Sequence, residues 1–151
     1  MRKLQGFTLI ELMITIIILA ILATLAVPSF AQMLRKYNLE SSAMELNMLL
    51  SEARATAVTT RKPITVYLNQ TSQIQTDDTK YWRPKGQVVY AGDTQKVVFT
   101  ALGKVQEINE QKSPLEFTLC DRAENSTLST TLTLTRSGNV QQIVKGLGGC
   151  V

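Results

Sequence analysis

The sequence contains no histidine and only two cysteines among its 151 residues. Histidine is the common general base near neutral pH and the commonest metal ligand, so its absence removes the usual means of acid–base and metal catalysis. Two cysteines far apart in the chain form no zinc-binding pattern. A G-x-S-x-G motif and a phosphate-binding glycine loop are also missing. We therefore expect no enzyme, no metal site and no cofactor.

Charge is absent between Leu12 and Leu34. At a rise of about 1.5 Å per residue, a helix over this run is long enough to cross a bilayer core of roughly 30 Å. Arg2 and Lys3 precede the apolar run, and one acid, Glu11, lies inside its start. A carboxylate in a membrane costs about 2.5–3.5 kcal/mol on insertion scales, so it normally has a partner and a function.

Three interpretations of this segment differ in the fate of Glu11. A secretory signal peptide, cut after Thr24-Leu25-Ala26, would have no use for the acid. A plain single-pass anchor would leave it unexplained. Cleavage after Gly6 would keep the apolar helix and create a new α-amino group at Phe7. That amine lies about one helical turn from Glu11, where opposite charge offsets the cost of burial.

The residues Gly6-Phe7-Thr8-Leu9-Ile10-Glu11 favour the third interpretation. They resemble the class III leader and mature N-terminus of type IV pilins and type II secretion pseudopilins. The resemblance implies that a membrane-embedded prepilin peptidase cuts after Gly6 and methylates the amine of Phe7. It also implies that Glu11 guides assembly by pairing with the N-terminus of a neighbouring subunit.

The helix is expected to continue beyond the uncharged run, with a kink at Pro28. One apolar stripe recurs at spacings of three and four residues, which is typical of a helix with one covered face. Pro63 ends the pattern. We expect the stripe to cover a sheet; a coiled-coil dimer is the alternative, although the alanines make a poor seam. The stripe consists of Leu39, Ala43, Leu46, Leu50, Ala53 and Ala57.

After Pro63 apolar residues alternate with polar ones, which is typical of strands with one buried face. Turn signals separate the runs, so we expect short antiparallel strands. A long N-terminal helix packed on a small antiparallel β-sheet domain is an α+β fold, and the resemblance identifies it as the pilin fold. The alternating runs are Ile64 to Leu68, Val97 to Phe99, Leu115 to Leu119 and Leu132 to Leu134, with a last strand from Val140.

The chain is thereby divided into four segments. They are a cleaved leader over 1–6, a hydrophobic transmembrane or filament-core helix over 7–34, an amphipathic helix half over 35–62, and a β-rich periplasmic domain over 63–151. Cys120 and Cys150 both fall in the last segment. An even number of cysteines in an oxidising compartment favours one disulfide, worth roughly 3–4 kcal/mol by loop closure, over two free buried thiols.

Internal matches narrow the resemblance to the GspH/FimT/FimU group of pseudopilins and minor pilins. The stretch 47–57 resembles its N-x-x-L-x-x-A-R-x-x-A pattern, 99–103 its Phe-x-x-x-Gly turn, and 134–138 its late strand and glycine. The late cysteine favours a FimU-type minor pilin. FimT-like members bind DNA through Gly-Arg-x-x-Arg, and the corresponding Gly138-Asn139-Val140-Gln141-Gln142 lacks both arginines.

The segment Lys80-Tyr81-Trp82-Arg83-Pro84-Lys85 is a second candidate for contact with DNA or another subunit. Its three cations could contact phosphates, and its aromatic residues could stack on bases. The competing interpretation, which we favour, is a solvated loop whose Trp82 packs against the sheet. Asp77 and Asp78 dilute the positive charge next to it.

The resemblance implies a structural minor pilin of a type IV pilus, placed in the tip or initiation complex that primes pilus assembly and supports twitching motility, adhesion or DNA uptake. The alternatives are an H-type minor pseudopilin of a type II secretion system and a FimT-like DNA-binding minor pilin. Expected partners are the prepilin peptidase, other minor pilins, the major pilin and the inner membrane; DNA is not favoured. We expect a single-pass inner-membrane protein with a periplasmic C-terminal domain that later enters the pilus at the cell surface.

Overall fold

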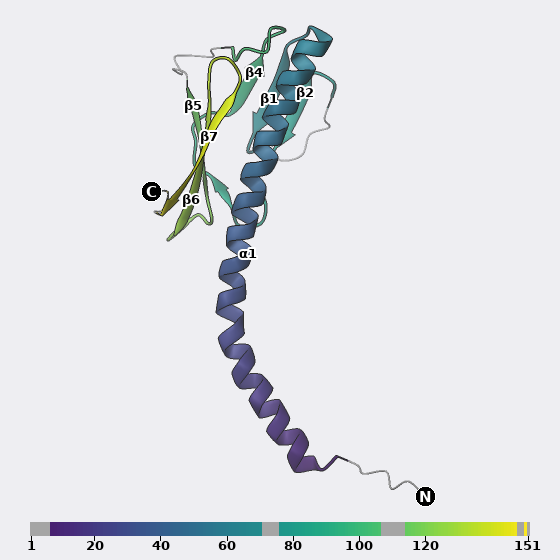
Figure 1. The fold of residues 1–151 in the computed structure, drawn as a ribbon, viewed down its shortest axis with the longest axis vertical. Coiled ribbons are helices and arrows are strands. Elements are labelled where there is room, and N and C mark those ends of the chain that lie inside the picture. The colour runs from purple at the N-terminus through teal and green to yellow at the C-terminus, as the bar shows by residue number, and fades with distance from the viewer. Residues whose placement is uncertain (1–6, 71–75, 107–113, 148–149, 151) are drawn as a thin grey trace, which may run out of the picture. The chain divides into compact units, whose positions relative to one another are not determined.

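The computed structural model describes residues 7–70, 76–106, 114–147 and 150 (Figure 1). The chain divides into two compact units, Met1–Leu34 and Arg35–Val151. A single helix supplies the described part of the first unit and the beginning of the second. The strands all lie in the second unit.

The helix, α1 (Leu9–Thr60), is continuous over its whole length. Thr8 precedes it, and the Thr8 Oγ1 accepts a hydrogen bond from the backbone N–H of Glu11 at 3.3 Å, which caps the first turn. Pro28 lies inside the helix without interrupting it, so the kink at this residue stays a prediction. Arg61 follows the last turn with a φ of 55°, the left-handed conformation in which helices often end.

The apolar stripe on the second half of α1 is buried against the strands, as the sequence predicts. Leu46, Leu50 and Ala53 pack in one core with strand residues that include Phe99 and Phe117. Because the chain itself covers this stripe, it leaves no seam for a coiled coil along that face. The stripe residues Leu39, Ala43, Leu46, Leu50, Ala53 and Ala57 are all buried.

Within the described residues, seven strands form two sheets. The first sheet has the order β2-β1-β4, with β1 (Ile64–Leu68), β2 (Thr79–Trp82) and β4 (Lys96–Phe99). The second has the order β3-β5-β6-β7, with β3 (Val89–Tyr90), β5 (Leu115–Cys120), β6 (Leu128–Leu134) and β7 (Val140–Leu147). Every pair in the second sheet is antiparallel, and a disulfide joins Cys120 at the end of β5 to Cys150.

The α+β class is confirmed, but the strand pairing differs from the expectation in two details. β1 pairs with β2 in parallel, with Thr65 opposite Thr79, and antiparallel with β4. The connection between these parallel strands, residues 69–78, is shorter than the dozen or more residues that usually join a parallel pair. The sequence also does not predict β2 and β3, because Trp82 is the one buried residue of β2 and β3 is only two residues long.

Arg54 ties α1 to a turn from each sheet. Its Nε donates to the carbonyl oxygen of Gly103 at 3.1 Å, and its guanidinium also donates to Oδ1 of Asn139. Gly103 follows β4, and Gly138 and Asn139 join β6 to β7. Both glycines have positive φ, 71° and 80°, and a Cβ on Gly138 would collide with the carbonyl of Gly103. The three internal motifs singled out in the sequence therefore meet in one cluster.

Gly138→Ala should destabilise this cluster strongly. A non-glycine residue in the left-handed region costs about 1–2 kcal/mol, and the collision with a backbone carbonyl adds to that. We expect the free energy of unfolding, measured by denaturant titration, to fall by at least about 2 kcal/mol. The matched control is Gly146→Ala, whose Cβ would meet the rotatable hydroxyl of Ser129. Equal effects of the two substitutions would contradict the cluster.

Candidate assembly surfaces

The first candidate surface is the apolar N-terminal part of α1. Among the described residues up to Leu34, the large apolar side chains are all exposed, with Phe7 82% and Leu25 70% accessible. Covering one large apolar side chain is worth about 1.5–3 kcal/mol, so this segment requires a bilayer or other protein chains around it. The helix is long and apolar enough to cross a membrane.

Glu11 lies in the first turn of this exposed helix. Among the described residues, no hydrogen-bond donor or cation pairs with its carboxylate. The positive end of the helix dipole favours an acid at this position. The carboxylate is therefore held at the start of an apolar helix, where it remains accessible to a cation from another molecule.

Thr8 is a helix-capping residue that the sequence interpretation did not single out. The spacing Thr8-x-x-Glu11 is that of a capping box, in which the threonine oxygen receives the N–H of the glutamate three residues later. This signal is readable in the sequence. It gives Thr8 a positioning role, because it fixes the first turn and with it the point from which the Glu11 side chain projects.

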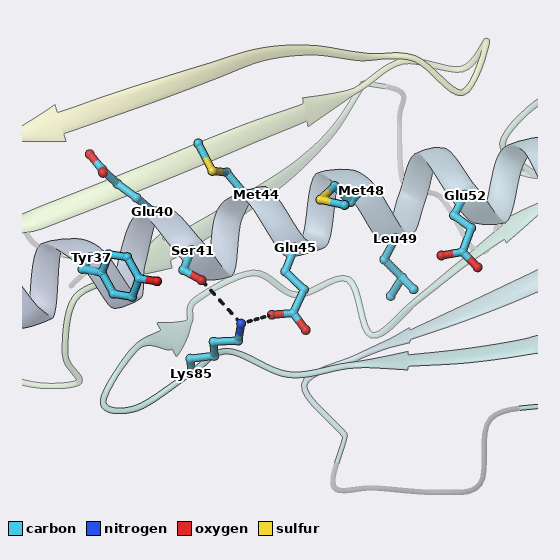
Figure 2. Close-up of a pocket in the computed structure, with 9 residues that line it drawn as sticks. All are labelled: Tyr37, Glu40, Ser41, Met44, Glu45, Met48, Leu49, Glu52 and Lys85. Carbon is cyan, nitrogen blue, oxygen red and sulfur yellow. Dashed lines mark hydrogen bonds and ion pairs between the residues drawn. The ribbon is translucent and has the colours of Figure 1, made fainter.

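The second candidate surface is an open groove on the outer side of α1 within the second unit, which we call the outer groove (Figure 2). Its volume is about 680 Å³. Tyr37, Met44 and Met48 give it exposed apolar surface, at 66%, 63% and 71% accessible. The lining residues are Tyr37, Glu40, Ser41, Met44, Glu45, Met48, Leu49, Glu52 and Lys85.

Lys85 forms one wall of the outer groove. Its Nζ lies 2.8 Å from a carboxylate oxygen of Glu45 and 3.4 Å from the Oγ of Ser41. Dashed lines in Figure 2 mark both interactions. Its backbone N–H donates to the Oγ of Ser42 at 2.9 Å, which anchors the segment to α1. The hydrogen bond and the charge of Glu45 raise the pKa of Lys85, so the ammonium group stays protonated.

The segment 80–85 takes a different form from the predicted loop, because its first part belongs to β2. Trp82 is 3% exposed and packs edge-on against Tyr90, with ring centroids 6.4 Å apart, so its ring is covered and not presented for stacking. Lys80 lies 3.3 Å from a carboxylate oxygen of Glu52. Arg83 is exposed. Contact of Lys80, Arg83 or Lys85 with DNA or a further subunit stays a prediction.

Asp121 organises the turn between β5 and β6, directly after the disulfide-bonded Cys120. Its buried carboxylate accepts hydrogen bonds from the Ser126 hydroxyl at 2.6 Å and from the Thr127 N–H at 3.1 Å. Burial by itself would raise the pKa of Asp121, but the hydrogen bonds from Ser126, Leu128 and Thr127 outweigh it and hold the pKa below its ordinary value.

Asp121→Asn should therefore destabilise the protein in a pH-dependent way. We expect a loss of about 1–3 kcal/mol in the free energy of unfolding near neutral pH, because the donors of Ser126, Thr127 and Leu128 lose their charged acceptor. The pKa of Asp121 is lower in the folded state than in the unfolded state. The extra stability of the wild type is therefore complete above the unfolded pKa of about 4, and it disappears as the pH falls through the folded pKa. Denaturant titrations from about pH 7 to about pH 2 should converge at the acid end. The control Glu124→Gln, exposed on the same turn, should change little at any pH, and a gap for Asp121→Asn that persists in acid would contradict this account.

Comparisons with known proteins gave matches for the N-terminal motif and for the fold. Residues 1–27 match the family of the prokaryotic N-terminal methylation motif. The fold is similar to the crystal structure of the type IV minor pilin FimU of Pseudomonas aeruginosa strain PAO1, with a TM-score of 0.50 and 18% sequence identity over 70% of this chain and 88% of that chain. A sequence comparison with curated proteins gives no match. The chain therefore carries the N-terminal methylation motif at the head of an apolar helix, and its fold is similar to that of the minor pilin FimU.

Proposed function

We propose that the protein is a minor pilin of a type IV pilus, a structural subunit of the tip or initiation complex that primes pilus assembly. The observation that carries the proposal is the methylation motif at the head of an apolar helix whose side chains the chain itself leaves exposed. Such a helix needs one environment before assembly, the inner membrane, and an equally apolar one afterwards, the bundled helices of a filament.

Processing would prepare the N-terminus for this transfer. Arg2 and Lys3 would keep the leader on the cytoplasmic side of the membrane, which puts the second unit in the periplasm. The prepilin peptidase would then cut between Gly6 and Phe7 and methylate the new amine. The Cys120–Cys150 disulfide is consistent with an oxidising compartment.

Glu11 would then act as the recruiting group. In an apolar bundle an unpaired carboxylate and an unpaired N-terminal ammonium group are both costly, and each relieves the cost of the other when they come from adjacent subunits. The hydrogen bond to Thr8 orders the first turn of the helix before assembly. The entropy cost of positioning the Glu11 carboxylate would then not fall on the assembly step.

DNA binding through the C-terminal stretch is a weaker candidate. Asn139 occupies the position of the first arginine of the Gly-Arg-x-x-Arg element, and its side chain accepts a hydrogen bond from Arg54. An arginine there would place two guanidinium groups together. In this chain the position therefore serves the fold.

Glu11→Ala should leave membrane insertion intact and reduce incorporation into pili by roughly tenfold or more, because a lost pairing of only about 1.4 kcal/mol is already a tenfold effect. The measurement is the amount of the protein in sheared pili relative to the membrane fraction. Glu124→Ala, which removes an exposed acid from the second unit, is the matched control and should incorporate normally. Wild-type amounts of Glu11→Ala in sheared pili would rule out the assembly role.

A further inference from the structure

The end of α1 at Thr60 and the turn after β4 form one surface, which we call the helix-end surface. β1 and β4 pair antiparallel with Ile64 opposite Phe99, so the chain that enters β1 and the chain that leaves β4 lie at the same edge of the sheet. A Cβ built on Gly103 would lie 2.8 Å from the Cγ2 of Val58, which places the turn against the end of α1. The helix-end surface consists of Val58, Arg61, Lys62, Leu102 and Lys104.

Three cations of the helix-end surface have no acid as a partner among the described residues. Arg61, Lys62 and Lys104 are all exposed, and the ion pairs within the described part of the chain involve none of them. Arg54, one helical turn before Val58, adds a fourth positive charge. Its guanidinium group donates to a carbonyl oxygen and to a side-chain amide, which are both uncharged. The positive charge at this end of the second unit is therefore not cancelled by direct contacts.

The acids Asp77 and Asp78 lie on the other side of β1 from the turn that carries Lys104. The backbone carbonyl of Asp78 is hydrogen-bonded to β1, and β2 and β4 flank β1 on opposite sides. At least two strand spacings, roughly 10 Å, therefore separate Asp78 from Lys104. This exceeds the screening length of about 8 Å at physiological salt. Both acids are nearer to Lys62, which precedes β1, but neither forms an ion pair with it.

Two exposed apolar side chains lie among these cations. Leu102 is 78% accessible, the highest value for a large apolar side chain among the described residues of the second unit, and Val58 is 48% accessible. The turn that presents Leu102 is closed by hydrogen bonds, from the Thr100 N–H to the Lys104 carbonyl at 2.9 Å and from the Gly103 N–H to the Thr100 carbonyl at 2.8 Å. An apolar side chain among unpaired cations suits a lipid surface, because it can enter the acyl boundary while the cations meet the headgroup phosphates.

Nucleic acid fits the helix-end surface less well. Proteins that bind single strands provide aromatic side chains on which the bases stack, and this surface contains none. The aromatic rings elsewhere in the second unit are engaged within the chain, since Trp82 is buried and Tyr67 stacks on Tyr81 with ring centroids 5.3 Å apart. A duplex would use the cations but would leave Leu102 uncovered.

We propose that the helix-end surface binds an anionic lipid bilayer, with Arg61, Lys62 and Lys104 against the headgroup phosphates and Leu102 inserted between the headgroups. This contact goes beyond the proposed function and does not depend on it, because the residues belong to the second unit and lie outside the methylation motif. It also differs from insertion of the apolar helix, which requires no anionic lipid.

Vesicle flotation of the full-length protein tests the proposal. The protein is reconstituted in nanodiscs of phosphatidylcholine, so that its apolar helix is already covered. The nanodiscs are then mixed with vesicles of phosphatidylcholine alone or of equal parts phosphatidylcholine and phosphatidylglycerol. We expect at least about tenfold more protein to float with the anionic vesicles, and we expect this difference to shrink as the salt concentration rises.

Charge-matched variants locate the contact. Arg61→Gln with Lys104→Gln should weaken binding to the anionic vesicles by roughly thirtyfold, because two cations lose their attraction to the headgroups. Arg83→Gln with Lys96→Gln removes the same charge from exposed positions outside the helix-end surface and should bind nearly as the wild type does. Leu102→Ser should weaken binding by about tenfold, because it removes the inserted side chain.

Three results would overturn the proposal. The first is equal binding to neutral and anionic vesicles, and the second is an equal loss from the two charge-matched pairs. The third is unchanged vesicle binding by Leu102→Ser together with tighter binding of a labelled DNA oligonucleotide, which would assign the surface to nucleic acid. None of these results bears on incorporation into pili, so the proposed function is tested separately.

Discussion

The structure depends on one constraint: the apolar residues at the start of α1 have no cover from the chain that carries them. From Phe7 to Leu34 their large side chains are exposed, and each would release about 1.5–3 kcal/mol on being covered. A bilayer can supply that cover, and so can a bundle of similar helices. A carboxylate such as that of Glu11 is costly in either environment unless a cation lies nearby, and the assembly role that we propose for Glu11 rests on this cost.

The second half of the same helix differs from the first, because its apolar stripe is buried against the strands of the same chain. The Arg54 cluster shows how this is achieved, because one side chain on α1 holds the turn after β4 and the turn between β6 and β7. Both turns use glycines at positive φ, so the backbone can approach closely there. The inner face of this helix half thus fixes the domain, while its outer face, with Tyr37, Met44 and Met48, is exposed.

Much of the fold follows from local periodicity in the sequence. The stripe from Leu39 to Ala57 and the runs in β1, β4, β5 and β6 are predicted because apolar spacing directly reports one buried face. β2 is not predictable in this way, since Trp82 is its one buried residue and apolar alternation does not report its parallel pairing with β1. The outer groove is likewise invisible to periodicity, because it depends on where Lys85 docks against α1. The sequence motifs that contain Arg54, Gly103 and Gly138 are recognisable one by one. Their contacts with one another are not, because they join three segments far apart in the sequence.

The central claim is that the apolar helix is kept and its N-terminus is remade at Phe7. The most direct test is the intact mass of the full-length protein extracted from membranes, combined with sequencing of its first peptide. The account predicts a chain that begins at Phe7 and carries one methyl group on its α-amine. A chain that begins at Met1, or one that begins at Val27 after loss of the helix, would contradict it.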